Sequence, residues 1–228
     1  MLKLGLGLSL SSIRPQGAWS PTDETSLEAW YKNKEGITLN GSDVSAWADS
    51  SSNSHNMVQA TASKQPAYNA STGALTFDKT AAQSLQTTSQ ISISGDFTVG
   101  IRLNPSSINV IVLGDNTINN EFFKLSNSST LRLKTDTGSN FIDITVNDGD
   151  LSADNYLVVT RASNLVSLYV NGTLQTDTET LAGTVDIDAI GVRNPDANPY
   201  DGIIKEIQIY DSTSAALTAN INTYLSTL

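Results

Sequence analysis

Alternating apolar and polar side chains form the strongest pattern in this chain, and the pattern is clearest between Tyr156 and Tyr210. Two alternating runs meet at Asn171-Gly172, a pair that suits the positive φ angles of a two-residue hairpin turn. A third run, Ile203 to Tyr210, also alternates and is bounded by an Asp-Gly pair before it and an Asp-Ser pair after it. This succession predicts antiparallel strands.

Similar runs recur along the rest of the chain, separated by clusters of Gly, Asn, Asp and Ser. Many short strands with turn residues between them predict an all-β antiparallel jelly-roll sandwich over residues 21–228, read as one domain. One helical turn is expected within Asp23 to Tyr31, and helical spacing within Ala215 to Leu225 predicts a short C-terminal helix. The expected strands are Gly73–Phe77, Phe97–Leu103, Val110–Leu113, Phe122–Leu125, Leu131–Lys134, Phe141–Val146, Tyr156–Arg161, Leu165–Val170, Thr173–Thr176, Val185–Ile190 and Ile203–Tyr210.

Residues 1–20 form a separate piece, in which five leucines alternate with other residues before a Pro15-Gln16-Gly17 break. Period-two leucines predict a strand with one apolar face, which a soluble protein covers or pairs. The strand belongs either to its own domain or, as we favour, to an arm that adds to a neighbouring subunit. The arm residues are Leu2, Leu4, Leu6, Leu8 and Leu10.

Composition narrows the range of functions. The formal net charge of −10 repels phosphate backbones, so nucleic-acid binding is not expected. The chain has no cysteine, hence neither disulfides nor thiolate metal sites. The opening run is short and interrupted by small residues, so we expect a strand there and not an export signal, and no run has the ~20 apolar residues that a membrane span requires.

Three segments together resemble one known family. They are SLEAWYKNKEGITLNGSDVSAWADSSSNSHN at residues 26–56, ALTFDKTAAQSL at 74–85, and the closing stretch from Tyr156 to Tyr210. The chain is similar to the concanavalin A-like lectin/glucanase superfamily, and within it to the laminin G-like domains of bacterial and phage proteins. The resemblance implies a jelly-roll sandwich with Trp30 and Trp47 in the core, while Trp19 remains the freer tryptophan. The fold by itself hosts lectins, hydrolases and structural modules.

The residues carry no constellation typical of catalysis. Glycoside hydrolysis needs two carboxylates facing each other, which in hydrolases of this superfamily alternate on one strand, and no two Glu residues share a strand face here. Asp186 and Asp188 do alternate, but we interpret them as lining a solvated face. The chain is therefore expected not to be an enzyme. No cofactor is expected either, because the family's Gly and acidic pair after Phe77-Asp78 are replaced by Lys79, Ala81 and Ala82, which removes oxygen ligands suited to Ca²⁺.

Two groups of residues are candidate ligand contacts. The loop from Asn194 to Asp201 offers Asp196 and Asn198 as oxygen donors and Tyr200 as a ring that could stack on a sugar, for a glycan or for Ca²⁺. Its alternative reading is a proline-rigidified turn with Asx hydrogen bonds. The second group is Asp49 and His55 in the loop after the DVSAW run, with a structural role as the alternative.

Function is then inferred from architecture. The first hypothesis is a bacteriophage virion structural protein, namely a capsid decoration, head-fibre or tail-associated subunit, assembled in the host cytoplasm and released on lysis. Its partners would be other virion proteins or copies of itself in a homo-oligomer. The second is a glycan-binding adhesin or receptor-binding module for a cell-surface glycan. A polysaccharide hydrolase or lyase comes third.

Overall fold

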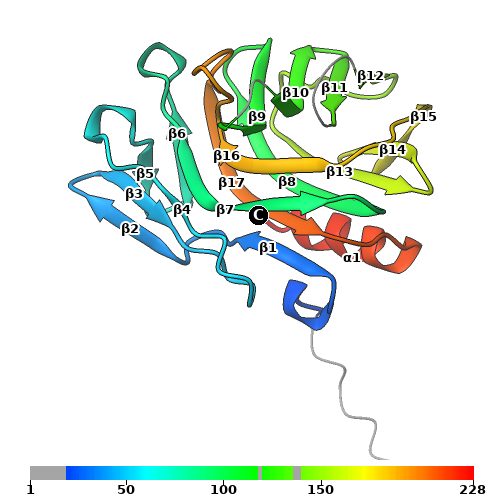
Figure 1. Cartoon of the computed structure of the whole chain (residues 1–228), viewed down its shortest axis with the longest axis horizontal. Helices are drawn as coiled ribbons and strands as arrows, with labels where there is room; N and C mark the ends of the chain where they lie inside the picture. Colours follow the sequence, from blue (N-terminus) through cyan, green and yellow to red (C-terminus); the bar gives the residue numbers. More distant parts are fainter. Residues whose placement is uncertain (1–18, 118–119, 136–139) are drawn as a thin grey trace, which may run out of the picture.

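The computed structural model describes residues 19–117, 120–135 and 140–228, which form two packed layers of antiparallel strands and one helix (Figure 1). Short 3₁₀ helices occupy Pro21–Asp23, Ala62–Lys64 and Lys79–Ala81, and the α-helix is α1 (Ala215–Leu225). The strands are β1 (Leu27–Tyr31), β2 (Ile37–Asn40), β3 (Asp43–Trp47), β4 (Met57–Val58), β5 (Ala67–Asn69), β6 (Ala74–Phe77), β7 (Leu85–Ile93), β8 (Phe97–Pro105), β9 (Val110–Asp115), β10 (Asn120–Asn127), β11 (Thr130–Lys134), β12 (Phe141–Thr145), β13 (Asn155–Ala162), β14 (Leu165–Val170), β15 (Thr173–Thr180), β16 (Val185–Ile190) and β17 (Gly202–Tyr210).

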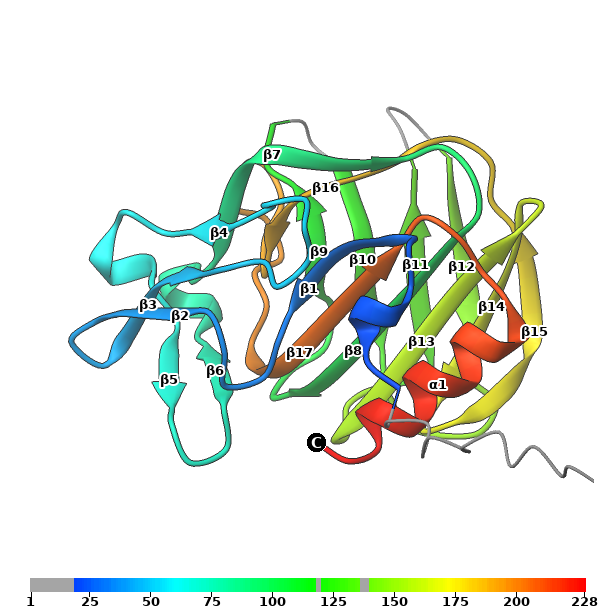
Figure 2. The same ribbon diagram turned by 90° about the horizontal axis from the view of Figure 1, so that it is seen from below.

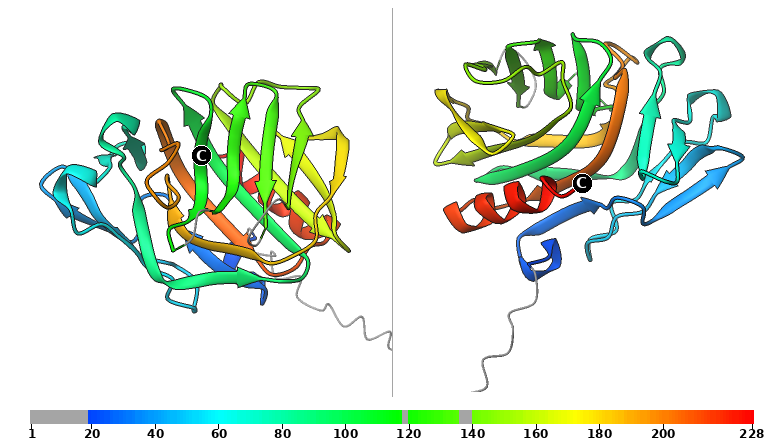
Figure 3. Two further views of the ribbon diagram at one scale, coloured as in Figure 1. Left: turned by 45° about the horizontal axis from the view of Figure 1, so that its top comes forward. Right: turned by 180° about the vertical axis from the view of Figure 1, so that it is seen from behind.

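Each layer is a run of antiparallel neighbours. One layer follows the order β1-β17-β8-β13-β14-β15, and the other follows β7-β16-β9-β10-β11-β12 (Figure 3). The short strands β2 to β6 extend the fold on one side, where β6 pairs with the start of β17 (Figure 2). The expected all-β jelly-roll sandwich with a short C-terminal helix is confirmed.

Side-chain alternation builds the core between the layers. On β14, Val166, Leu168 and Val170 are buried in the main core, while Tyr169 points to the opposite face and packs against the cluster under α1. This is the arrangement that the hairpin pattern predicts, and Asn171 and Gly172 make the turn with φ of 50° and 82°. Burial of apolar side chains on both faces of this layer is the main stabilising contribution.

The last strands of the chain are not direct neighbours in the sheet, as the sequence had predicted them to be. We expected the hairpin to be closed directly by the Ile203–Tyr210 run, but β8 lies between them, pairing Leu157 with Ile101 on one side and Ile101 with Ile207 on the other. Alternation assigns strands and faces, but it does not reveal which distant strand becomes a neighbour.

The segment from Pro21 to Tyr31 also differs from what the sequence predicts. The helical turn expected within Asp23 to Tyr31 is a 3₁₀ helix over Pro21–Asp23, and the rest of that segment becomes β1, whose Leu27 and Tyr31 pair with Tyr210 and Ile207. Backbone pairing with β17 and burial of four of the five β1 residues outweigh the weak local helical preference. Trp30 and Trp47 are buried, as expected.

The leucine arm lies outside the described residues, apart from Trp19 and Ser20 at its end. Within the described ranges, no helix has the length and apolar character needed to span a membrane.

Candidate functional site

A long bulge in β7 opens the edge of one layer. Ile187 of β16 pairs with Ile91 of β7, but Ala189, two residues further on, pairs with Gln86. Residues 87–90 are therefore left out of the ladder, and β16 turns to pair with β9 at Ala189 and Ile190. A bulge of this kind redirects side chains away from the sheet and leaves backbone and polar groups exposed at its edge.

The bulge forms one wall of a cleft of about 560 Å³, which we call the polar cleft. Its other walls are the end of β4, the turn after β9 and the middle of β16, and its volume is typical of a small-molecule site. Val58, 49% exposed, gives it an apolar surface. The lining residues are Val58, Gln59, Ala60, Gln86, Thr87, Thr88, Gln90, Asn116, Thr117 and Asp188.

The Gln86 and Gln90 side chains in the polar cleft each use one polar atom in a hydrogen bond within the protein and present the other to the cleft. Asn116 donates from Nδ2 to Gln86 Oε1 at 2.9 Å, and Gln90 donates from Nε2 to Asp115 Oδ2 at 3.2 Å. Asn194 fixes the turn by donating to the Asn116 carbonyl at 2.9 Å. Gln86 Nε2 and Gln90 Oε1 have no hydrogen-bond partner among the described residues. The cleft thus presents oriented donors and acceptors to a ligand.

Two carboxylates lie beneath this surface. Asp188 is 3% exposed and accepts a hydrogen bond from the Asn116 amide at 2.5 Å. Burial, with the nearby Asp115 and Asp186 charges, raises the pKa of Asp188 to about 6 although backbone donors oppose the shift. Asp115 is buried too, and its Oδ1 accepts from both the amide and the hydroxyl of Thr117. Among the described lining residues, Asp188 is the only charged one.

The predicted residues Asp49 and His55 serve the site indirectly. Asp49 accepts hydrogen bonds from the Trp30, Ser51 and His55 amides, which orders the loop between β3 and β4. His55 Nδ1 lies 2.7 Å from the Ser89 carbonyl and 3.1 Å from its hydroxyl, inside the β7 bulge. These contacts brace the bulge, and neither residue lines the polar cleft.

The loop from Asn194 to Asp201 does not gather its predicted donors into a site. Asp196 pairs with Lys64 Nζ at 2.6 Å, and Asn198 donates to the Asn109 carbonyl at 3.2 Å. Tyr200 is fully buried edge-on against Phe77, with its hydroxyl donating to the Ile203 carbonyl at 3.0 Å. Stacking of a sugar on Tyr200 is therefore wrong, since the ring is part of the core. The loop does turn, with the Ala197 amide donating to the Arg193 carbonyl at 3.2 Å, but the Asx hydrogen bonds of the alternative reading are not found among the described residues.

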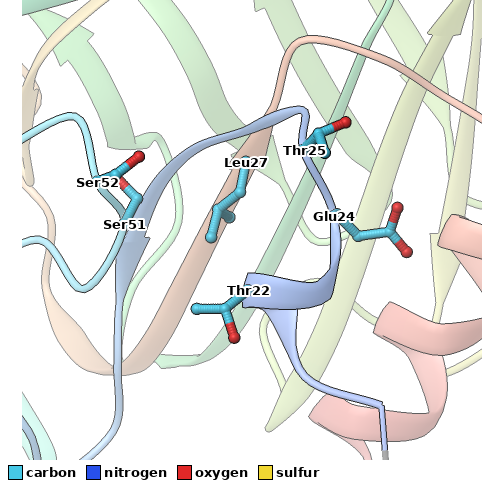
Figure 4. A pocket seen from close by; sticks show the side chains of 6 residues that line it. All are labelled: Thr22, Glu24, Thr25, Leu27, Ser51 and Ser52. Carbon is cyan, nitrogen blue, oxygen red and sulfur yellow. The ribbon is translucent and has the colours of Figure 1, made fainter.

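A smaller hollow of about 250 Å³ lies between the first 3₁₀ helix and the Asp49 loop (Figure 4). Leu27 points into it, Ser51 and Ser52 form one side, and Glu24 turns toward α1. Glu24 accepts from the Trp19 indole at 2.9 Å, so its carboxylate has a partner. Across the described ranges, no three His, Asp or Glu side chains gather to hold a metal ion.

Sequence reasoning missed the amides of the polar cleft. The available signal was the run Gln86-Thr87-Thr88-Ser89-Gln90, five consecutive polar residues flanked by apolar ones. Such a run breaks the alternation of a strand and marks the position where β7 leaves the ladder.

The sequence matches a laminin G-like family model described as the concanavalin A-like lectin/glucanases superfamily, over residues 77–220. The chain belongs to this superfamily. A search of curated protein sequences found no match.

Two solved structures illustrate the likeness in fold. Domain 4 of AbnA, a GH43 extracellular arabinanase from Geobacillus stearothermophilus solved with arabinotriose, has 16% identity and a TM-score of 0.60, with 87% of this chain and 97% of that chain covered. Trypanosoma rangeli sialidase in complex with sialic acid has 14% identity and a TM-score of 0.54, with 90% of this chain and 33% of that chain covered. At these identities the likeness concerns the fold, and this chain corresponds to about a third of the sialidase.

Proposed function

We propose that this chain is a glycan-binding module that holds a neutral oligosaccharide in the polar cleft without cleaving it. The main support is a set of three amide side chains, Gln86, Gln90 and Asn116. Hydrogen bonds within the protein hold them in place and leave some of their donors and acceptors open to a ligand. Groups oriented before binding lose little conformational freedom, so their hydrogen bonds to sugar hydroxyls contribute more to affinity.

The charge of the cleft supports a neutral ligand. The described lining residues include no Lys, Arg or His, and Asp188 supplies a negative charge in its deprotonated form. An acidic sugar would meet this charge without a cation to pair with, at a cost that grows as water is excluded. Arabinotriose, seen with the arabinanase domain, is a neutral oligosaccharide of the class proposed here.

The arrangement of carboxylates supports binding without hydrolysis. Glycosidases place two carboxyl groups roughly 5–9.5 Å apart on either side of the scissile bond. Here Asp188 lines the cleft, whereas Asp115 lies behind it with both carboxylate oxygens accepting hydrogen bonds. A glycan in the cleft would therefore meet one carboxylate.

A binding experiment tests the proposal directly. The purified chain is screened on an array of neutral and sialylated oligosaccharides, and Kd values for the best probes are measured by calorimetry. We expect binding to neutral probes, weakened roughly three- to tenfold in Gln86→Ala and in Gln90→Ala, the effect of one lost hydrogen bond. The same probes should yield no new reducing ends.

The matched control is Asn140→Ala, which removes an exposed amide before β12, away from the lining residues, and should leave Kd unchanged. Preference for sialylated probes, or equal Kd values in all variants, would contradict the proposal. Reducing-end release that disappears in Asp188→Asn would show a hydrolase instead.

The virion role expected from the sequence stays a prediction. Its support is a cysteine-free sandwich of low charge rich in Ser, Thr and Asn, the expected lack of an export signal, and the leucine pattern of residues 2–10, which lie outside the described residues. Glycan binding and assembly into a particle are compatible in one protein, so the two functions are tested separately.

A further inference from the structure

One face of α1 forms a second hollow, which we call the helix-edge hollow. Asn220, Thr223, Tyr224 and Thr227 are spaced i, i+3, i+4 and i+7, so they follow one strip along the helix and its end. This strip and Trp19 line a hollow of about 330 Å³. In Figure 2, β7 runs along the upper side of the molecule, whereas α1 lies at the lower right.

Both aromatic rings turn their polar atoms away to partners in the protein. Trp19 donates from Nε1 to Glu24 at 2.9 Å, and the Tyr224 hydroxyl bonds to the buried Glu206 carboxylate. Burial, with the Glu206 charge, raises the pKa of Tyr224, so the hydroxyl stays protonated and donates. The two rings meet at 78° with centroids 6.1 Å apart, which makes a corner of ring carbons.

Polar groups stand beside this apolar corner. The Thr223 and Thr227 hydroxyls donate to the Ala219 and Tyr224 carbonyls at 2.9 and 2.7 Å, which leaves their oxygen lone pairs as acceptors. Asn220 is partly buried, and its amide has no hydrogen-bond partner among the described residues. A ligand that fits must therefore combine an apolar face with donors and acceptors at its edge.

We infer that the helix-edge hollow is a second saccharide site, in which one neutral sugar ring packs its C–H face on Trp19 and Tyr224 and hydrogen bonds to Asn220. A purely apolar occupant would cover the rings but leave the Asn220 amide unpaired, at the cost of desolvating it. The volume lies at the low end of the roughly 300–1,000 Å³ typical of ligand sites, which suits one or two rings. This inference is independent of the polar cleft, and either site can fail alone.

Tryptophan fluorescence distinguishes this site, because Trp30 and Trp47 are buried and Trp19 is the partly exposed tryptophan of the described residues. The full chain carrying Gln86→Ala and Gln90→Ala is titrated with arabinotriose, cellotriose and maltotriose while acrylamide quenching is recorded. We expect at least one probe to protect the fluorescence from quenching. Trp19→Ala should abolish calorimetric binding of that probe, and Asn220→Ala should weaken it roughly three- to tenfold.

Trp19→Phe distinguishes the contribution of ring stacking from that of the hydrogen bond to Glu24, because it keeps an aromatic ring and loses that hydrogen bond. It should retain most of the affinity, as should the Asn140→Ala control. Absence of protection by all three probes at millimolar concentration overturns the inference, as does unchanged binding in Trp19→Ala. If deletion of residues 2–14 makes Trp19 more accessible to acrylamide without sugar, that segment fills the hollow and the inference is wrong.

Discussion

Asp188 owes its buried position to the bulge in the neighbouring strand. It alternates with Asp186 in sequence, and a regular strand would place both on one solvated face. Asp186 is partly exposed and accepts from the Ser92 hydroxyl at 2.7 Å, whereas Asp188 is buried where β16 leaves β7 for β9. The expected solvated face is wrong for Asp188, because a period-two pattern cannot reveal a break in register.

The raised pKa of Asp188 predicts a pH dependence of stability. In the unfolded chain this carboxyl loses its proton near pH 3.8, but in the folded chain near pH 6, so between these values the folded state binds more protons. The Asp188 contribution to the free energy of unfolding is therefore most favourable at low pH and decreases as pH rises from about 4 to 6, by on the order of 2–3 kcal/mol.

Urea unfolding of the chain and of Asp188→Asn across this range isolates the effect, because other groups titrate in both proteins. The stability of the chain relative to Asp188→Asn should decrease with rising pH. Glu179→Gln, which removes an exposed carboxyl on β15 in the other layer, is the control and should run parallel to the chain. A constant difference between the chain and Asp188→Asn would contradict the assignment.

For single residues, the sequence identified side chains able to bind a ligand, but it did not predict where each of them lies in the fold. Asp49 and His55 were predicted as ligand contacts in one loop. They do interact, because Asp49 accepts a hydrogen bond from the His55 amide, but their other partners are Trp30 and Ser89 of the protein itself. Tyr200 was identified as an exposed ring and is core. Asp49, His55 and Tyr200 are polar or amphipathic side chains in loops, and only tertiary contacts decide whether such groups face a ligand or the protein.

Elements with strong periodicity could be predicted from sequence, and short ones could not. β13, β14, β16 and β17 lie within about two residues of their expected bounds, and α1 was expected where it occurs. Strands β2 to β5 were missed, since two to five residues give too few alternations to distinguish a strand from a loop. β7 was missed because its polar run conceals the strand, and that same run makes the cleft.

The docking of α1 on β8 depends on Gly100. A Cβ at this position would lie 2.5 Å from Ile221 Cγ2 and 3.1 Å from Leu225 Cδ1. Ile221 is β-branched and has one strongly preferred χ1 rotamer in a helix, so the methyl cannot turn aside and the helix must move. We expect Gly100→Ala to lower the free energy of unfolding by about 1–3 kcal/mol.

Urea unfolding followed by circular dichroism measures this loss, and Gly95→Ala is the matched control. A Cβ at Gly95 meets no atom within 4 Å, so that substitution should not destabilise the chain. Equal stability of Gly100→Ala and Gly95→Ala would mean that the helix packs more loosely than the geometry indicates. Since Tyr224 lies on the same helix, Gly100→Ala should also weaken any binding at the helix-edge hollow.

For the whole molecule, architecture is easier to infer than ligand chemistry. The hairpin at Asn171-Gly172 and the β17 motif define a sandwich that many unrelated functions share. The proposed ligand chemistry depends on local features, a polar run in β7 and a strip on α1, which lie outside the three sequence segments quoted for the resemblance although the family match over residues 77–220 includes the polar run. The overall charge of −10 adds one constraint, because it disfavours acidic ligands for both sites.

The last prediction concerns the leucine arm and assembly. The described residues bury a continuous core of their own, and β1 at the end of its layer pairs with β17. Deleting residues 2–14 should therefore leave the melting temperature nearly unchanged, while an apolar strand face that pairs with a neighbour is lost. Sedimentation equilibrium should then show an oligomer for the full chain and a monomer for the shortened one. If instead the deletion unfolds a chain that was monomeric from the start, the leucines belong to their own core, and the case for a subunit of a larger particle loses its sequence support.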